Sequence, residues 1–348
     1  MTTPWGYPDF DAHEALHIVT DEASGLRAII SMHSTHLGPA AGGSRFWHYA
    51  DDTDALTDAL RLSRGMSYKN AMAGLPLGGG KAVLLANAER DKSPEMLAAF
   101  GRAVDSLGGK YVTAEDVGMS VSDMIEVARQ TDYVAGLPVD TGVGGDPGPH
   151  TSLGVFLGIK AAVKRAIGKD SLAGLHIALQ GAGSVAGGVA RHAYAEGARL
   201  SVADVDSNRA QALATLCNAT VVDPADIMTL EADVFSPNAL GAILDEASIS
   251  ALNAPIVAGG ANNQLKTSAD GKRLMDRGIL YAPDYVINAG GIINVSTEYL
   301  RDGDIDLVSE RIEAIPGRLD TIWADSASSG RDPAAVADAM AQQLIGRG

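Results

Sequence analysis

Residues 176–186 read HIALQGAGSVA, and this stretch decides the fold. The apolar letters of HIALQ predict a buried strand, and a helix is predicted to begin at Ser184. Between them, GAGSVA fits the pattern GxGxxG/A of a dinucleotide-binding βαβ unit. In that unit Gly181 makes the tight turn, Gly183 lets a pyrophosphate approach the backbone, and Ala186 allows close packing of the helix.

Asp204 ends the next predicted strand, at the distance from Gly183 that the dinucleotide motif requires, about 20 residues. A carboxylate at this position accepts hydrogen bonds from the ribose hydroxyls and repels a 2′-phosphate. The pyrophosphate is expected at the N-terminus of the helix, where the backbone amides favour negative charge. The sequence therefore predicts a dinucleotide site for NAD rather than NADP.

The fold class predicted from this stretch outward is α/β with two domains. Strands and helices alternate over residues 151–324, which indicates a Rossmann doubly wound parallel sheet. Residues 1–138 mix a hairpin at 16–32 with helices and further strands, so a second α/β domain with a mixed sheet is expected there. Four glycines and two prolines in VDTGVGGDPGPH predict a hinge at 139–150, and a helix near 325–348 is expected to pack back on the first domain.

The composition of the chain argues against nucleic acid and membranes as partners. The chain has 348 residues and a formal net charge of −16, which disfavours binding to nucleic acid or to an anionic membrane surface. It contains no apolar run near the roughly 18 residues that span a bilayer, and its N-terminus does not resemble a signal peptide. Cys217 is the single cysteine, which fits a reducing, cytoplasmic location.

The stretch NAMAGLPLGGGKAVLL at 70–85 raises the question of a phosphate-binding loop. The P-loop pattern GxxxxGK[ST] requires glycine where this chain has Leu75, and a hydroxyl where it has Ala82. Lys81 also opens a run with high β-propensity, whereas the P-loop lysine leads into a helix. The three glycines are therefore expected to let another group lie close to the backbone.

Residues 13–17 read HEALH and match the zinc motif HExxH. The motif needs a helix, but His17 belongs to an alternating run that predicts a strand, in which residues four apart are separated by about 13 Å. We therefore predict no metal site, and interpret His13 and His17 as surface histidines near a sheet edge.

Several longer runs share one resemblance. They are GPAAGGSRFW (38–47), GMSYKNAMAGLPLGGGKAV (65–83), TAEDVG (113–118), QGAGSVA (180–186), GGANNQL (259–265) and APDYVINAGGIINV (282–295). In this order they resemble the leucine, phenylalanine, valine and tryptophan dehydrogenases, a branch of the amino-acid dehydrogenases related to glutamate dehydrogenase. The resemblance covers about residues 16–300, and several motifs agreeing together are more specific than any one of them.

The resemblance implies reversible NAD-dependent oxidative deamination of an apolar L-amino acid, aliphatic or aromatic, to its 2-oxo acid and ammonia. The first domain would bind the substrate and the second NAD, in a homo-oligomer. Lys69 would bind the substrate carboxylate, Lys81 would be the general base, and Asp116 would transfer protons. Asn262 would contact both substrate and nicotinamide.

Physical chemistry agrees with these roles. A buried carboxylate needs a cation, which Lys69 can supply. A lysine base must be neutral near the working pH, although a free lysine titrates near pH 10.4. Burial and a second cation lower its pKa; we expect that cation beside Lys81 to be Lys69. The glycines before Lys81 would then form a floor without side chains, on which a small amino acid lies.

The remaining residues follow from the same motifs. The implied substrate-binding residues are Gly42, Gly43 and Met66, with Ala41, Ala114, Ile292 and Val295 completing an apolar pocket. The implied cofactor-binding residues are Gly181, Ala182, Gly183, Ser184, Val185, Asp204, Ala239, Asn262 and Asn288. Ala41 stands where leucine dehydrogenases tend to carry leucine, so the pocket is expected to admit a side chain larger than that of valine. Because no group that would read an acidic side chain is evident, glutamate is not expected as the substrate.

Two alternatives stay open at this point. One is another two-domain NAD-dependent dehydrogenase, such as one that decarboxylates a hydroxy acid, which would be expected to have carboxylate ligands for a divalent metal. The other is a catalytically inactive NAD-binding regulator, which would have little reason to retain Lys69, Lys81 and Asp116 together.

Overall fold

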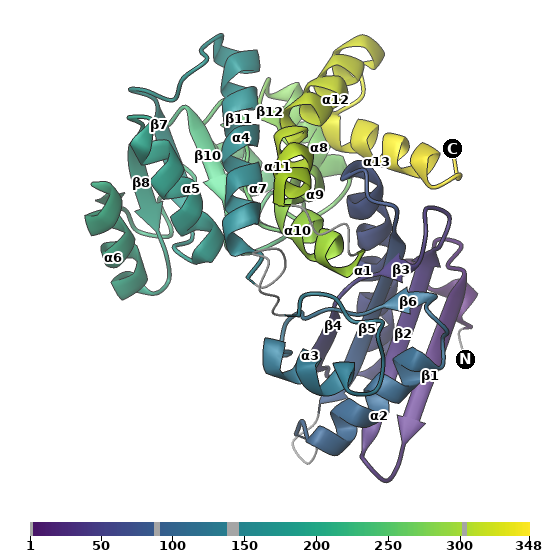
Figure 1. The fold of residues 1–348 in the computed structure, drawn as a ribbon. Coiled ribbons are helices and arrows are strands. Elements are labelled where there is room, and N and C mark those ends of the chain that lie inside the picture. The colour runs from purple at the N-terminus through teal and green to yellow at the C-terminus, as the bar shows by residue number, and fades with distance from the viewer. Residues whose placement is uncertain (1–2, 87–90, 138–145, 301–304) are drawn as a thin grey trace. The chain divides into compact units, whose positions relative to one another are not determined.

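The computed structural model describes residues 3–86, 91–137, 146–300 and 305–348 (Figure 1). The chain forms two compact units. Unit 1 comprises Met1–Gly145, Asn294–Leu307 and Ala341–Gly348, and unit 2 comprises Asp146–Ile293 and Val308–Met340. Most of the predicted hinge, 139–145, lies outside the described residues, and the chain is already helical from Gly148.

Unit 1 contains a mixed six-stranded sheet in the order β1-β2-β5-β3-β6, with β4 also paired to β5. The pairs β1·β2 and β2·β5 are antiparallel, and the other pairs are parallel. The mixed sheet is the one expected for this part of the chain. Its strands are β1 (Ala15–Asp21), β2 (Leu26–Ser34), β3 (Ala40–Ala41), β4 (Ser44–His48), β5 (Gly78–Ala86) and β6 (Tyr111–Val112).

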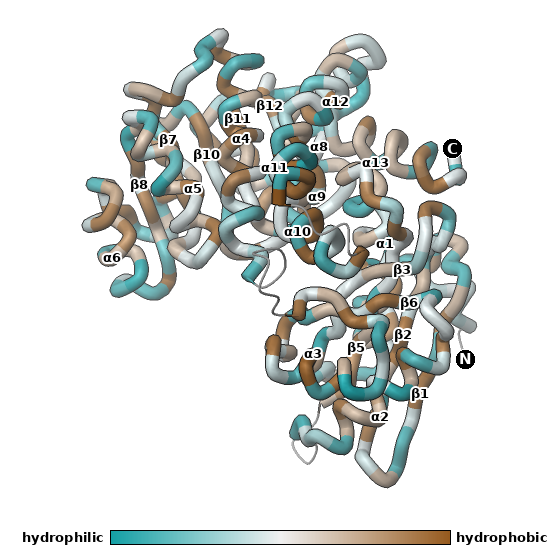
Figure 2. Tube along the Cα trace, viewed as in Figure 1, coloured by the Kyte–Doolittle hydropathy of each residue, from teal (hydrophilic) through white to brown (hydrophobic). Residues whose placement is uncertain are grey.

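Helices cover both faces of this sheet. They are the short 3-10 helix η1 (Pro4–Gly6), α1 (Asp52–Met72), α2 (Pro94–Asp105) and α3 (Val121–Ala128). Successive strand residues point to opposite faces: Leu84 joins the core formed with α2 and α3, while Val83 joins a cluster with Ala55 and Ala59 of α1. The central strand β5 is therefore covered on both sides, and Figure 2 shows hydrophobic residues along it.

Unit 2 contains six parallel strands in the order β12-β11-β10-β7-β8-β9. Numbered by appearance within the unit, this is 6-5-4-1-2-3, the strand order of the Rossmann fold. The doubly wound sheet predicted from residues 176–186 is therefore confirmed. The strands are β7 (His176–Gln180), β8 (Arg199–Ala203), β9 (Thr220–Val221), β10 (Val234–Pro237), β11 (Ile256–Val257) and β12 (Leu280–Tyr281).

The helices of unit 2 lie between and after these strands. They are α4 (Gly148–Ile167), α5 (Ser184–Ala195), α6 (Ser207–Cys217), α7 (Glu246–Ala251), α8 (Ala269–Asp276), α9 (Asp284–Ile287), α11 (Ile305–Glu313) and α12 (Ile315–Ser329). Trp323 of α12 is buried, and its indole donates a hydrogen bond to the carbonyl of Tyr281 at 2.8 Å. Among the described residues, no helix is long and apolar enough to cross a membrane.

Three helices belong partly to each unit: α10 (Gly290–Tyr299), α13 (Pro333–Leu344) and α11, whose residues up to Leu307 group with unit 1. The sequence assigned 294–307 to the dinucleotide domain and the whole of 325–348 to the first domain. By their contacts, 294–307 group with unit 1, and of the C-terminal segment only Ala341–Gly348 does so. Hydropathy periodicity reports that a helix is amphipathic, but it does not say which unit covers its apolar face.

A buried polar cluster joins distant parts of unit 1. Arg347 donates from Nη1 to the carbonyl of Asp11 at 2.6 Å and to Nε2 of His33 at 2.7 Å. The other ring nitrogen of His33 lies 2.8 Å from Oγ of Ser67. Nε2 of His33 also lies 3.2 Å from Oδ2 of Asp11. Because arginine can only donate, its shorter contact makes Nε2 an acceptor and His33 neutral, with the proton on Nδ1. Burial, and then the charge of Arg347, lower the pKa of His33 to about 3.

This cluster predicts acid sensitivity. Unfolded His33 titrates near 6.5, whereas folded His33 stays neutral to a pH of about 3. The contribution of neutral His33 to the free energy of unfolding is therefore complete above about pH 6.5. It is lost as the pH falls toward 3, because in this range the unfolded chain binds more protons than the folded chain does. Between pH 7.5 and 5 the free energy of unfolding should fall by about 2 kcal/mol from this group. Urea unfolding of the wild type and of His33→Gln measures it, and equal pH slopes in the two proteins would contradict it.

Candidate active site

The two predicted catalytic residues are in direct contact. Lys81 lies in β5, and its Nζ donates to Oδ2 of Asp116 at 2.6 Å. The lysine side chain is 6% exposed and the aspartate side chain 25% exposed. The pairing of β3 with both β5 and β6 carries Asp116, four residues beyond β6, to this point of the sheet. The sheet therefore brings together two groups that are 35 residues apart in the chain.

Burial and neighbouring charges shift the pKa values of both Lys81 and Asp116. Burial lowers the pKa of Lys81, although the nearby carboxylate of Asp116 opposes that shift. Burial alone would raise the pKa of Asp116, but the charges of Lys81 and Arg45 outweigh it and lower that pKa. Asp116 is thus held as a carboxylate, while Lys81 loses its proton more readily than a free lysine does.

The three glycines lie inside β5, and the atoms above them belong to the protein itself. A methyl group on Gly78 would lie 1.9 Å from the carbonyl oxygen of Ser34, and one on Gly79 would lie 2.0 Å from the amide nitrogen of Ser67. On Gly80 it would lie 2.7 Å from the ring of Tyr111. The interpretation of these glycines as an open floor for the substrate is therefore wrong. They allow α1 and neighbouring backbone to lie against β5.

The other predicted substrate-binding residues of unit 1 surround the same strand. A methyl group on Gly42 would meet the carbonyl of Gly80 at 1.8 Å and the side chain of Met66 at 3.1 Å. On Gly43 it would lie 3.0 Å from Cβ of Asp116. Lys69 is half-buried in the last turn of α1. Gly43 therefore lies against Asp116, while Gly42, with Met66 beside it, lies against Gly80, the residue before Lys81.

Three of the four residues predicted to line the side-chain pocket, Ala41, Ala114 and Val295, belong to unit 1. Ala41 of β3 is buried, and the carbonyl of Ala114 accepts a hydrogen bond from the amide of Ser44 at 2.8 Å. Val295, on the part of α10 that groups with unit 1, would lie 3.7 Å from a methyl group placed on Gly136. Ile292 belongs to unit 2. Its role in the pocket stays a prediction.

The glycine-rich loop of unit 2 has the features that a pyrophosphate needs. Gly181 has a φ of 100°, which only glycine adopts easily. No described atom lies within 4 Å of a methyl group placed on Gly183, so the space beside its backbone is open. α5 begins at Ser184 with no side-chain cap from the described residues, which leaves its first amides to bind an anion.

The remaining predicted cofactor residues also belong to unit 2. Asp204 accepts from the amide of Ala182 at 2.7 Å, so the acid also fixes the glycine-rich loop. Ala239 lies against Gly181, at 3.2 Å from a methyl group placed there. Asn288 donates from Nδ2 to Oδ1 of Asn262 at 2.8 Å. Oδ1 of Asn288 is buried without a hydrogen bond from the described residues, as expected of an acceptor that awaits a ligand. These residues fit a dinucleotide.

Two family profiles match the chain. A family profile described as "Glu/Leu/Phe/Val dehydrogenase, dimerisation domain" matches residues 13–133. A second, "Glutamate/Leucine/Phenylalanine/Valine dehydrogenase", matches residues 201–329. The chain belongs to the glutamate/leucine/phenylalanine/valine dehydrogenase family. It is an amino-acid dehydrogenase, and the resemblance drawn from its motifs is confirmed.

Several relatives of this dehydrogenase are similar over nearly their whole length. Leucine dehydrogenase of Bacillus subtilis (strain 168) is 46% identical over 96% of this chain and 92% of the relative. Valine dehydrogenase of Streptomyces albus is 45% identical over 97% and 94%. The crystal structure of L-tryptophan dehydrogenase from Nostoc punctiforme matches with a TM-score of 0.85 and 41% identity, covering 96% of each chain. The family is NAD(P)-dependent, so the dehydrogenase uses a nicotinamide dinucleotide.

Sequence reasoning missed one charged residue of the dehydrogenase's site. Arg45 of β4 donates from Nε to Oδ2 of Asp116 at 2.9 Å and from Nη1 to Oδ2 of Asp58 at 2.8 Å. It stands inside the quoted run GPAAGGSRFW, but no spacing rule links it to Asp116. The second cation beside Lys81 is therefore Arg45, and the proximity of Lys69 stays a prediction.

The HExxH match has a structural explanation. His17 lies in β1, as predicted, and the two histidines do not share a helix. His13 is buried, with Nε2 3.0 Å from the carbonyl of Leu60, so its interpretation as a surface histidine is wrong. Among the described residues, no group of three or more His, Cys, Asp or Glu is placed to hold a metal ion.

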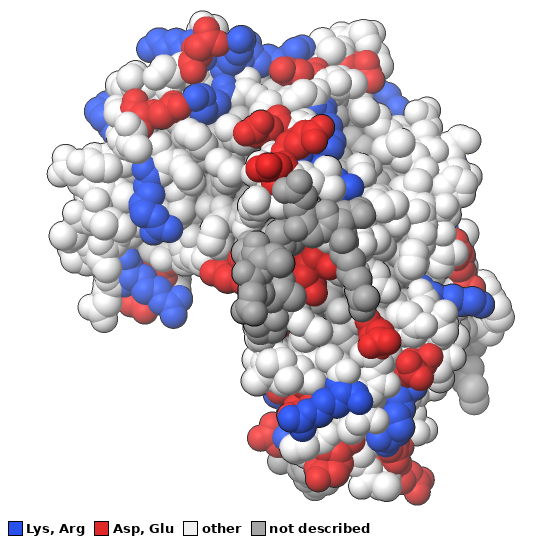
Figure 3. Space-filling view, viewed as in Figure 1, with Lys and Arg blue, Asp and Glu red and all other residues white. Residues whose placement is uncertain are grey.

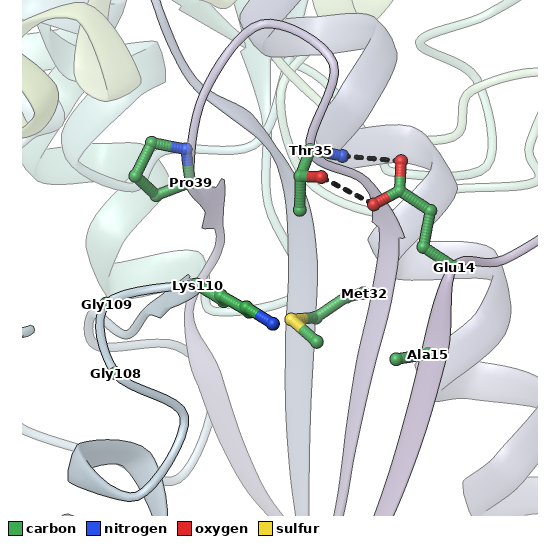
Figure 4. Close-up of a pocket in the computed structure, with 8 residues that line it drawn as sticks. All are labelled: Glu14, Ala15, Met32, Thr35, Pro39, Gly108, Gly109 and Lys110. Atoms are coloured by element: carbon green, nitrogen blue, oxygen red, sulfur yellow. Dashed lines mark hydrogen bonds between the residues drawn. The ribbon is translucent and has the colours of Figure 1, made fainter.

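One shallow pocket of about 370 Å³ lies at another part of unit 1 (Figure 4). Its lining residues are Glu14, Ala15, Met32, Thr35, Pro39, Gly108, Gly109 and Lys110, and none of them is a predicted site residue. The Glu14 carboxylate is already bound by the amide and hydroxyl of Thr35, at 2.8 and 2.6 Å.

On the face of the molecule shown in Figure 3, acidic and basic side chains lie interspersed.

Proposed function

We propose that this dehydrogenase catalyses the reversible NAD-dependent oxidative deamination of an apolar L-amino acid, aliphatic or aromatic, to its 2-oxo acid and ammonia. The observation that carries the proposal is the buried contact between Lys81 and Asp116, with 2.6 Å between Nζ and Oδ2. A buried lysine with a lowered pKa beside an ionised carboxylate provides a base and a proton carrier at one place.

Each residue then has a task. Lys69 holds the substrate carboxylate. The glycine-rich loop and Asp204 would hold the dinucleotide, which would supply the acceptor for the hydride of the α-carbon. The substrate becomes an iminium, and neutral Lys81 removes a proton from the water that attacks it. Asp116 carries protons to and from the amino group, so that ammonia leaves and the 2-oxo acid remains. Asn262 helps to hold the substrate.

Small residues support an apolar side chain in the substrate. Ala41 lies in β3, which pairs with β6, and Ala114 follows β6, two residues before Asp116; Val295 would add an apolar wall. The similar proteins act on leucine, valine and tryptophan according to their names. Two alanines leave room for a side chain larger than that of valine.

Asp204 supports NAD as the form of the cofactor. It follows β8 and accepts from the amides of Ala182 and Asp206 at 2.7 and 2.8 Å. Each carboxylate oxygen has a second lone pair, so the acid can still accept bonds from ribose hydroxyls. A 2′-phosphate placed beside it would meet a negative charge.

We extend the proposal to the roles of the two units, the oligomeric state and the location in the cell. Unit 1 would bind the substrate and unit 2 the dinucleotide. The first profile describes a dimerisation domain, and the outermost strand of the mixed sheet, β1, carries Ile18 at 81% exposure. These observations support a homo-oligomer. The single cysteine supports a cytoplasmic location.

A substrate panel tests the function. Absorbance of the reduced nicotinamide is followed with L-leucine, L-valine, L-phenylalanine, L-tryptophan and L-glutamate in alkaline buffer, and with the matching 2-oxo acids plus ammonium. We expect turnover with apolar members and little with glutamate. Turnover of glutamate above all apolar members would refute the substrate class, and no turnover in either direction would refute the function.

Gly183→Ala should separate cofactor binding from folding. The position has a φ of −76° and open space around it, so alanine fits the chain without strain. The methyl group would occupy the space that the pyrophosphate needs, and KM for NAD should rise about tenfold or more while the melting temperature stays near that of the wild type. An unchanged KM would show that the pyrophosphate does not approach Gly183.

A further inference from the structure

Arg45 stands at the centre of a chain of five polar groups in unit 1. Lys81 contacts Asp116, Asp116 contacts Arg45, Arg45 contacts Asp58, and Asp58 accepts from the hydroxyl of Tyr49 at 2.5 Å. The side chains of Arg45, Asp58 and Asp116 are each about one quarter exposed. The chain joins β5, the segment after β6, β4 and α1.

The two cations converge on one atom. Lys81 and Arg45 both donate to Oδ2 of Asp116. Within the described part of the chain, Oδ1 of Asp116 has no hydrogen bond. An arrangement with one oxygen saturated and the other available fixes the carboxylate plane and leaves an acceptor for a further proton donor.

The guanidinium is itself fixed. Its planar fork presents donors in rigid directions, and here Nε and Nη1 reach two different carboxylates. Asp58, two turns into α1, is held in turn by Tyr49. A lysine at position 45 would keep the charge, but one ammonium on a flexible stem cannot reproduce this fork.

The charge of Arg45 also acts on both partners. It lowers the pKa of Asp116, together with the charge of Lys81 and against burial. It lowers the pKa of Lys81, in the same direction as burial and against the charges of Asp116 and Asp58. Removing this charge should therefore raise the pKa of both groups.

We propose that Arg45, anchored by Asp58, is a positioning residue of the deamination, which holds Asp116 by Oδ2 so that Oδ1 stays available to the reacting amine. The proposal rests on the proposed function of Lys81 and Asp116. It assigns Arg45 no contact with the substrate. Asp58 acts by holding the guanidinium of Arg45, and Tyr49 acts by holding Asp58.

The test compares Arg45→Gln, Arg45→Lys and Asp58→Asn with a matched control. The control is Arg27→Gln, because Arg27 pairs with Asp52 of the same helix α1 at 2.8 Å, in an exposed ion pair outside the site. The readouts are kcat and KM for L-leucine, the pH dependence of kcat/KM, and the melting temperature. Arg45→Gln should lower kcat about tenfold to hundredfold, the size expected when a reacting group is misplaced.

The pH profile separates positioning from a purely structural role. In Arg45→Gln the acid-side limb, on which kcat/KM rises as Lys81 loses its proton, should move to higher pH, because Lys81 loses the neighbouring cation. Arg45→Lys should restore the limb but only part of kcat, and Asp58→Asn should lower kcat less than Arg45→Gln does. KM for NAD should be unchanged in all four variants, and Arg27→Gln should match the wild type throughout.

Two outcomes would overturn the proposal. One is a wild-type kcat and pH profile in Arg45→Gln. The other is a loss of activity that follows the loss of folded protein, with the profile of the remaining enzyme unchanged. If the wild type oxidises no apolar amino acid, the proposed function fails and this proposal fails with it; if the wild type does and Arg45→Gln behaves like it, only the positioning role fails.

Discussion

Replacing Lys81 with methionine is expected to lower kcat for oxidation of an apolar L-amino acid by about 10²–10⁴-fold, the usual contribution of a general base. Methionine keeps most of the buried volume but cannot take a proton from water. Asp116 keeps Arg45 as a partner after the change, so its charge is not left alone in a buried site. NAD binding should stay close to that of the wild type, because the glycine-rich loop belongs to unit 2.

Steady-state kinetics and a fluorescence titration with NADH measure the two effects. Lys160→Met is the matched control, since Lys160 forms a half-buried ion pair with Glu196 in unit 2 and has no place in the reaction. The control should keep its turnover. If Lys81→Met turned over at the wild-type rate, Lys81 would not be the base.

Gly79→Ala is expected to destabilise unit 1 more than any surface change. The methyl group would lie 2.0 Å from the amide nitrogen and 2.5 Å from Cα of Ser67, which are backbone atoms of α1. Overpacking of a core usually costs about 1–3 kcal/mol, and the cost here should reach the upper end because neither backbone can turn aside. The shift of α1 should also reduce turnover, because α1 carries Met66 and Lys69.

Gly65→Ala provides the control on the same helix. Among the described residues, no atom outside the helix backbone lies within 4 Å of a methyl group at this exposed position of α1, so alanine should stabilise the helix by about 0.5–1 kcal/mol. Urea unfolding of the two variants should therefore give changes of opposite sign. A Gly79→Ala protein as stable as the wild type would mean that α1 and β5 are not packed as closely as described.

The parts that the sequence predicted well were governed by local rules. Residues 176–186 contain a strand, a turn that needs Gly181, and a helix start in one continuous run, so the dinucleotide unit followed from short-range chemistry. Ser93 and Pro94 form another local signal, since serine before proline is typical of a helix start, and Ser93 accepts from the amide of Met96. The cap of α1 is Asp51, but its neighbours Asp52 and Thr53 can also act as caps, so local rules alone do not fix the first residue of this helix.

The parts that it missed depend on packing between distant segments. The glycines at 78–80 were interpreted through the neighbouring Lys81, whereas their reason lies in Ser34, Ser67 and Tyr111 on other elements. The role of Arg45 needs β4, α1 and the segment after β6 to meet. No periodicity or motif spacing encodes such a meeting, so these contacts become visible only in the folded chain.

The balance of products with L-leucine is the most direct test of the central claim. Purified protein is incubated with L-leucine and NAD, and NADH, the 2-oxo acid and ammonium are quantified from the same reaction. Oxidative deamination predicts that the three form in equal amounts, and that Lys81→Met forms almost none of them. Formation of NADH without ammonium, or equal yields from the wild type and Lys81→Met, would contradict it.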